Sequence, residues 1–269
     1  SILGRQPSFG QGASMSARPS KRALVTGGAM GLGKALSANL AAQGWQVTII
    51  DRDATKIVEK DQLHSIKCDL SDPVAVDRLI EELINQDPFD SVIHNAAVSA
   101  TGRFETIPVQ KYHQLMQLNV TTPMIISSRL AAAGRLNRGA HLVFLSSLSH
   151  FTGYPGAAVY SASKDAIAVY AKSIRKPFAK IGVTVSCVFP GPMKTQQAER
   201  HSPTNADAEK RMQPETAAAL ILKSVFANRK TILPGANAKA FAALGKVMPI
   251  VTDFAMRKII YEKLDKDVY

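Results

Sequence analysis

Short runs of apolar residues alternate along this chain with longer stretches in which apolar positions recur every three or four residues. The short runs are typical of strands, and the longer amphipathic stretches are typical of helices that cover a sheet. Such alternation indicates βα units that feed a parallel sheet. The pattern therefore predicts an α/β fold with a doubly wound parallel sheet.

The pattern places the predicted elements between Lys21 and about residue 235. Seven strands are expected, at Ala23–Thr26, Gln46–Asp51, Leu63–Cys68, Ser91–His94, Ala140–Ser146, Val183–Phe189 and Thr231–Leu233. Five helices are expected, at Gly33–Gln43, Pro73–Asn85, Pro108–Arg135, Val159–Ile181 and Pro214–Asn228. Gln196–Gln213 is polar and aperiodic, and we expect a mobile loop there, over the mouth of the site.

Two segments fall outside this domain of residues 21–235. Residues 1–20 are rich in Ser, Gly, Arg, Gln and Pro and predict a disordered leader, with Met15 as a candidate natural start. Residues 236–269 predict a basic amphipathic helical extension that is interrupted at Pro249. For this extension, packing on the domain or on a second subunit is favoured over contact with a membrane surface.

Composition limits the classes of protein that remain. The chain of 269 residues is 46% hydrophobic, enough for one full core, and it has no apolar run long enough to span a bilayer. Its formal charge of +12 is scattered rather than gathered in blocks, so we do not expect a nucleic-acid partner. Two cysteines, Cys68 and Cys187, in apolar runs make a disulfide framework unexpected and favour a reducing, cytoplasmic location.

A glycine-rich turn, Thr26–Gly33, follows the first predicted strand and opens the first predicted helix. This context is the one that a dinucleotide-binding fingerprint requires. Gly27 allows the tight turn, Gly31 lets the backbone approach a pyrophosphate, and Gly33 allows close packing of helix on strand. The helix N-terminus favours the phosphate charge.

Tyr160 and Lys164 lie four residues apart in a predicted helix and therefore project from the same face. An ammonium group beneath the phenol would stabilise the ionised form and lower the pKa of Tyr160, which makes an acid/base group. Ser147 stands thirteen residues before the tyrosine.

These residues belong to an ordered set of motifs that resembles the short-chain dehydrogenase/reductase family from Lys21 to about Leu233. The family's fingerprint is TGxxxGxG, and the further matches are Cys68-Asp69-Leu70, His94-Asn95-Ala96-Ala97, Asn119, Ser147, Tyr160, Lys164 and Pro190-Gly191 with Thr195. The family usually has NNAG where this chain has His94-Asn95-Ala96-Ala97, and only local packing is affected by that difference.

The resemblance implies hydride transfer between a nicotinamide and a carbonyl or alcohol carbon. Ser147 would donate a hydrogen bond to the substrate oxygen, and Tyr160 would exchange the proton. Lys164 would lower the pKa of Tyr160 and hold the ribose hydroxyls. Asn119 would position a water that links Lys164 to solvent.

The resemblance also implies a set of cofactor-binding residues. They are Gly27, Met30, Gly31, Leu32, Gly33, Asp51, Arg52, Asp69, Leu70, Asn95, Ala96, Tyr160, Lys164, Pro190, Gly191 and Thr195. The carboxylate of Asp51 at the end of the second strand can accept both ribose hydroxyls and repels a 2′-phosphate, which favours NAD. Arg52 beside it leaves NADP open as the alternative.

The substrate is less well defined by the sequence. Expected substrate-side residues are Ser147, His150, Tyr154 and Met193, a mostly apolar set that indicates a hydrophobic ketone or secondary alcohol. The extension resembles that of family members that act on lipid-like or steroid-like ketones. No cluster has the spacing of a metal site, so no metal is expected. The reaction direction stays open.

Two alternatives and the assembly remain to be considered. The chain could be a dinucleotide-sensing binding protein, although the intact Ser147, Tyr160, Lys164 and Asn119 argue against this, or a membrane-peripheral lipid ketone reductase.

The long helices at 108–135 and 159–181 carry surplus apolar residues and predict a homodimer. The extension is expected to block a tetramer and to lie near the substrate mouth.

Overall fold

The computed structural model describes residues 20–53, 55, 57, 61–201, 211–262 and 267–269. The leader predicted over residues 1–19, the middle of the predicted loop (202–210) and residues 263–266 of the extension lie outside the described residues.

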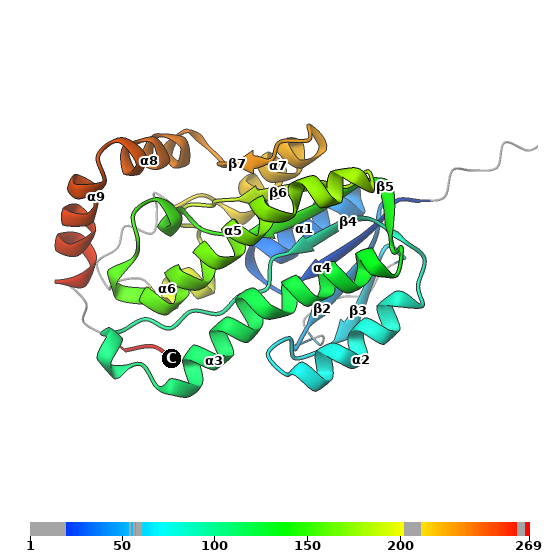
Figure 1. Cartoon of the computed structure of the whole chain (residues 1–269), viewed down its shortest axis with the longest axis horizontal. Helices are drawn as coiled ribbons and strands as arrows, with labels where there is room; N and C mark the ends of the chain where they lie inside the picture. The colour runs from blue at the N-terminus through cyan, green and yellow to red at the C-terminus, as the bar shows by residue number, and fades with distance from the viewer. Residues whose placement is uncertain (1–19, 54, 56, 58–60, 202–210, 263–266) are drawn as a thin grey trace, which may run out of the picture.

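A seven-stranded parallel sheet forms the centre of the molecule (Figure 1), as the sequence predicts. Its order is β3-β2-β1-β4-β5-β6-β7. The strands are β1 (Arg22–Thr26), β2 (Gln46–Asp51), β3 (Leu63–Lys67), β4 (Phe89–His94), β5 (Leu136–Leu145), β6 (Thr184–Val188) and β7 (Thr231–Ile232). The chain order reverses between β1 and β4, which creates a crevice at the carboxyl ends of the strands.

Helices cover both faces of the sheet, which makes the fold doubly wound (Figure 1). One face carries α2 (Pro73–Ile84), α4 (Thr122–Ala132) and α5 (Ala158–Lys180), and the other carries α1 (Gly31–Ala42) and α7 (Pro214–Phe226). The only tryptophan of the chain, Trp45, stacks on Phe226 with ring centroids 5.3 Å apart in the α1/α7 layer.

The helix predicted over Pro108–Arg135 differs from the structure. It consists of α3 (Val109–Met116), a π-helical segment η3 (Gln117–Thr121) and α4, and β5 begins at Leu136 rather than Ala140. Pro123 has no N–H group to donate, and its ring crowds the carbonyl of Asn119 four residues earlier. The N–H of Thr122 instead donates to Gln117, five residues back, which widens the turn around Asn119.

The predicted loop Gln196–Gln213 is wrong in its first part, because Gln196–His201 forms a short helix, α6. Thr195 explains the helix: its side-chain oxygen accepts from the N–H of Ala198 at 3.1 Å, and its carbonyl accepts from Glu199 at 2.9 Å. A threonine in this position satisfies N–H groups that the first turn leaves unpaired.

The extension forms α8 (Ala236–Val247), α9 (Pro249–Met256) and a π-helical turn η6 (Arg257–Tyr261), with the break at Pro249 as predicted. α8 packs on the domain, since Ala238 and Ala242 join the core on the α2/α4/α5 face. Gly245 lies so close to Phe151 that an added Cβ would stand 2.6 Å from its carbonyl oxygen. In the described part of the chain, no helix combines the length and the apolar character needed to cross a bilayer.

Candidate active site

The carboxyl ends of β1, β2, β4 and β5 bring the predicted motifs to one edge of the sheet. Thr26 ends β1, Asp51 ends β2 and Asn95 follows β4, while Ser146 and Ser147 follow β5. Because parallel strands end at the same edge, motifs far apart in sequence become neighbours here.

The glycine-rich turn between β1 and α1 has the backbone geometry that its sequence predicts. Gly27 adopts φ +68°, and its N–H donates to the carbonyl of Ile50 at 2.8 Å. A Cβ at Gly33 would stand 2.0 Å from the carbonyl oxygen of Gly27, so only glycine allows α1 to begin this close to the turn. Among the described side chains none caps the start of α1, which suits a helix start that receives a phosphate group.

Asn95 and Thr26 tie the glycine-rich turn to β4. The side-chain amide of Asn95 donates to the carbonyls of Thr26 and Gly27 at 3.1 and 3.0 Å. The Thr26 hydroxyl in turn accepts from the N–H groups of Asn95 and Ala96, both at 3.1 Å. Asn95 therefore holds the turn in shape.

Asp51 lies against the same turn. Its carboxylate accepts from the N–H of Ala29 at 3.0 Å and from the N–H of Asp53 at 3.1 Å. Each oxygen of this carboxylate accepts one of these bonds and keeps a further lone pair. The carboxylate can therefore accept two more hydrogen bonds, as a ribose diol requires. Met30, at the position before α1, is exposed and carries no positive charge.

Asp69 and Leu70 occupy the next position along this edge. The carboxylate of Asp69 accepts from the Ser71 hydroxyl at 2.7 Å, and this bond, with the nearby Arg52 charge as a smaller cause, lowers the pKa of Asp69. The carbonyl of Leu70 accepts from the Thr122 hydroxyl at 2.8 Å, which connects this loop to α4.

Tyr160 and Lys164 lie on one face of α5, as their spacing predicts. The Lys164 Nζ stands 5.6 Å from the centroid of the phenol ring, and it donates to the carbonyl of Leu145 at 2.8 Å. Lys164 is almost completely buried. The Ser146 hydroxyl donates to the carbonyl of Lys164 at 2.8 Å and so fixes α5 to the end of β5.

The pKa values of this pair differ from the sequence-based expectation. Burial raises the pKa of Tyr160 to about 12, with the neighbouring Tyr154 adding to the rise, while the hydrogen bond with Ser147 acts against it. Burial lowers the pKa of Lys164 to about 8. The expected lowering of the Tyr160 pKa is therefore absent from the protein alone, because burial removes water from the phenolate and so disfavours its charged form.

Asn119 lies in the widened turn η3 and is buried. Its side-chain oxygen accepts from the N–H of Val98 at 2.9 Å, and its amide donates to the carbonyl of Val98 and to the Ser163 hydroxyl, each at 2.9 Å. Ser163, which sequence reasoning missed, also donates to the carbonyl of Tyr160 at 2.7 Å. Its position three residues after Tyr160 was the available signal.

The Pro190–Thr195 segment lies against the glycine-rich turn. The carbonyl of Pro190 accepts from the N–H of Leu148 at 3.2 Å, and a Cβ at Gly191 would contact the Leu148 side chain at 3.2 Å. Thr195 lies beside Gly31, where an added Cβ would stand 3.2 Å from the threonine methyl group. These contacts place the segment between the turn and the residues that follow β5.

The predicted substrate-side residues separate in the structure. Ser147 bonds with Tyr160, and Tyr154 lies near enough to Tyr160 to affect its pKa. His150 instead pairs with Asp165 through Nδ1 and Oδ1 at 2.6 Å. The described contacts of Met193 are a bridge with Met212 and packing against the core of the α1/α7 layer.

Among the described residues, no group of three His, Cys, Asp or Glu side chains could hold a metal ion. His94 is buried, stacks on Phe144 and bonds the Ser127 hydroxyl at 2.8 Å, and burial lowers its pKa to about 3. It is a structural residue, and its neighbours explain why this chain tolerates His94 in that motif.

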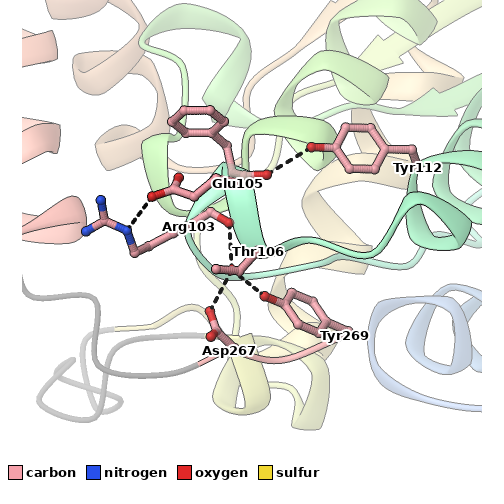
Figure 2. Close-up of polar contacts among 7 residues, drawn as sticks. Arg103, Glu105, Thr106, Tyr112, Asp267 and Tyr269 are labelled. Carbon is pink, nitrogen blue, oxygen red and sulfur yellow. Dashed lines mark hydrogen bonds and ion pairs between the residues drawn. The ribbon is translucent and has the colours of Figure 1, made fainter.

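The last described residues of the chain, which sequence reasoning did not place, lie against the loop at Arg103–Thr106, where the Thr106 hydroxyl bonds Asp267 and Tyr269 (Figure 2). Thr101 and Val268 form an antiparallel bridge in which each N–H donates to the other carbonyl, at 2.9 and 2.8 Å. The Thr106 hydroxyl bonds the Tyr269 hydroxyl at 2.7 Å. Tyr269 also packs with Tyr160 against a small apolar cluster, Ala100, Ile107, Leu115 and Val159.

Comparison with known proteins shows which family the chain belongs to. A family model described as short chain dehydrogenase matches residues 21–206. The chain is 31% identical over 179 residues to the 3-oxoacyl-acyl-carrier-protein reductase MabA of Mycobacterium tuberculosis, covering 65% of this chain and 70% of that protein. It is 29% identical over 233 residues to 1-deoxy-11-beta-hydroxypentalenate dehydrogenase of Streptomyces exfoliatus, covering 81% and 84%.

Solved structures agree as well. A short chain dehydrogenase from Burkholderia cenocepacia in complex with NADP superposes with a TM-score of 0.69 at 25% identity, covering 81% of this chain and 98% of that one. One from Streptomyces avermitilis gives a TM-score of 0.76 at 22% identity, covering 93% and 100%, and shows the shared fold. The chain belongs to the short-chain dehydrogenase/reductase family and is an NAD(P)-dependent oxidoreductase acting on CH–OH groups.

Proposed function

We propose that this protein transfers a hydride between a nicotinamide cofactor and the carbonyl or alcohol carbon of a hydrophobic substrate. The observation that carries the proposal is the grouping of Ser147, Tyr160 and Lys164 next to the glycine-rich turn. The bound nicotinamide would supply or accept the hydride, and the residues of the chain would manage the proton and the geometry.

The proposed proton donor is Tyr160, whose phenol carries a proton at neutral pH and forms a hydrogen bond with Ser147. Ser147 would orient the substrate oxygen toward that phenol. Lys164 is held by Leu145 in the protein alone and would turn its charge toward the ribose and phenol when the dinucleotide is present. Ser163 and Asn119 would hold α5 and the segment at Val98 in position relative to each other.

NAD is the proposed cofactor, with NADP the alternative. Similar structures include complexes with NAD and with NADP, so the choice rests on this chain's own residues. The Asp51 carboxylate beside Ala29 would repel a 2′-phosphate, and Met30 offers no positive charge to offset this. Arg52 lies near Asp69, whose carboxylate competes for its charge.

A hydrophobic ketone is the proposed substrate class. Tyr160 lies against the apolar cluster that includes Val159 and Ile107, and Tyr154 and Tyr269 add aromatic surface beside it. Such walls bind apolar groups well and offer few fixed polar partners. Relatives named as a 3-oxoacyl-acyl-carrier-protein reductase and a 1-deoxy-11-beta-hydroxypentalenate dehydrogenase are consistent with a keto or hydroxyl substrate.

A homodimer in the cytoplasm is proposed for the assembly and location. Of the apolar residues on the long helices, Leu115, Ile126 and Ile167 are buried in the chain's own core, whereas Met116, Ile125 and Val169 are exposed and available to a partner. Cys68 and Cys187 are free and buried, which suits a reducing compartment.

The test is turnover of a panel of apolar ketones with NADH and NADPH, followed by nicotinamide absorbance. Tyr160→Phe should abolish turnover and leave dinucleotide affinity nearly unchanged, because the ring still packs but has no proton to transfer. Tyr170→Phe is the matched control, since it removes a phenol hydroxyl that bonds only Met124 in the described contacts. More than a few per cent of activity in Tyr160→Phe would exclude Tyr160 as the proton donor.

A further inference from the structure

The bend between α8 and α9 exposes a group of large apolar side chains, which we call the apolar corner: Leu244, Val247, Met248, Ile250, Val251 and Phe254. Val247 is 79% exposed and Ile250 is 83% exposed. In Figure 1 these two helices lie at the outer edge of the molecule, where α9 turns away from α8 and runs down that edge. Large apolar groups gathered at such an edge mark an interaction site.

The fold does not use the apolar corner. Ala238, Ala242 and Gly245 are buried on the side of α8 that faces the domain, where the partly buried Phe241 also packs on the core, and Thr252 is the buried residue of α9. In the described part of the chain, α8 and α9 thus have an inner side packed on the domain and an outer side of large exposed apolar residues. The apolar residues of the outer side can be shielded from water only by a partner from outside the chain.

Basic side chains surround the apolar corner. Lys239 and Lys246 project from α8, and Arg257 and Lys258 follow α9, all of them exposed. Lys246 reaches over the Phe151 ring at 5.3 Å, and Lys258 bonds Glu262 at 2.9 Å. An apolar centre with a basic border is the pattern of a surface that sinks into a bilayer of anionic lipid.

A second copy of the chain fits the apolar corner less well. In a two-fold contact the same patch meets itself, so the lysines and arginines of one copy would face those of the other. An anionic bilayer offers the opposite charge together with an apolar interior.

We propose that the apolar corner of α8 and α9 docks the protein on the surface of an anionic lipid bilayer. The two helices would lie in the interface without crossing it. α8 contacts Phe151, and η6 packs on the turn at Pro155–Ala157 just before α5, so the bilayer would face the entrance of the site. The docking itself does not depend on the reaction that the site performs.

The test is co-sedimentation of the full-length protein with vesicles of phosphatidylcholine alone and of phosphatidylcholine with phosphatidylglycerol. Binding should require the anionic lipid and should weaken as salt is added. Ile250→Glu with Phe254→Glu should reduce the bound fraction at least about tenfold, because two deeply inserted groups become charged. Val74→Glu is the matched control, since Val74 is 57% exposed on α2, away from the corner, and binding should be unchanged.

The charge contribution is tested separately. Lys239→Gln should weaken binding to the anionic vesicles about fivefold, and Lys223→Gln on α7 should not. Circular dichroism and thermal unfolding of each variant should show that the fold is retained, because all the substitutions are at exposed positions. The turnover measurements with soluble ketones do not enter this test, so failure of one proposal leaves the other measurable.

Three outcomes would overturn the proposal. One is no sedimentation of the wild-type chain with anionic vesicles at low salt. Another is equal loss of binding in Val74→Glu and in the Ile250→Glu variant, which would mean non-specific attachment. The third is a change in oligomeric mass caused by Ile250→Glu without any vesicle binding, which would make the corner a contact between copies.

Discussion

At the scale of single residues, Tyr160 shows what a sequence can and cannot predict. Its spacing to Lys164 predicts a common helix face, and in the structure the Lys164 Nζ stands 5.6 Å from the centroid of the phenol ring. Burial is a property of the whole fold, and it raises the pKa of the phenol where local spacing predicts a fall. Ser163 was missed for the same reason, since its partner Asn119 is distant in sequence.

His94 gives a prediction for stability as a function of pH. Its pKa falls from about 6.5 in the unfolded chain to about 3 in the fold, so the unfolded state binds more protons between these values. Stability should therefore decline as pH falls through this window, by up to about 1.4 kcal/mol per pH unit from this group. His94→Asn should show a shallower decline in urea unfolding, and an unchanged slope would mean that other groups cause it.

Asp51 gives a prediction for cofactor choice. The wild-type protein should prefer NADH over NADPH, and Asp51→Ala should reduce this preference by about 1–3 kcal/mol by removing repulsion of the 2′-phosphate. Asp51→Asn is the control for the turn, because its amide oxygen retains an acceptor for Ala29. The ratio of kcat/KM for the two cofactors measures the effect. A wild-type preference for NADPH would make Arg52 the deciding residue.

At the scale of elements, the strands and the main helices follow the hydrophobic pattern closely, because each is specified by its own residues. The π-helical segment at Gln117–Thr121 was not predicted, although Pro123 carried the signal. α6 was missed because a short exposed helix shows little periodicity, and Thr195 was the available cue. The bridge between Thr101 and Val268 could not be predicted from local sequence, since it joins distant segments.

That bridge gives a prediction at the same scale. Val268→Pro removes the N–H group that donates to Thr101, and it should cost about 1 kcal/mol of local stability. The amide of Thr101 should then exchange with deuterium faster, and KM for apolar ketones should rise because Tyr269 is no longer held beside Tyr160. Val268→Ala keeps both backbone bonds and should leave the exchange rate unchanged. Equal rates in the two variants would contradict a stable bridge.

At the scale of the whole molecule, two groups of apolar residues are exposed, each on a different set of helices. One lies on the long helices and includes Met116, Ile125 and Val169, and the other is the apolar corner of α8 and α9. These apolar helix faces are not covered by the chain's own core. Exposed apolar surfaces of this kind indicate binding to a partner outside the chain. The two surfaces have separate proposed partners, a second subunit and a bilayer.

The assembly prediction separates these surfaces. Light scattering should return a dimer for the full-length chain, and Val169→Asp should give monomers because it places a charge in the proposed contact. Val247→Asp is the matched control on the apolar corner and should remain dimeric. A tetramer for the wild-type chain, or a dimer that survives Val169→Asp, would show that the helices pair differently.

The position of Trp45 makes its intrinsic fluorescence a probe of the folded state. As the only indole, stacked on Phe226 and almost fully shielded from solvent, it should dominate the intrinsic fluorescence and emit at short wavelength in the folded protein. It belongs to the α1/α7 layer, whereas α8 packs on the other side of the sheet. The wavelength of its emission maximum should therefore stay constant when vesicles are added. It should shift to the red only when the α1/α7 layer unfolds, so the fluorescence of Trp45 can distinguish membrane attachment from unfolding.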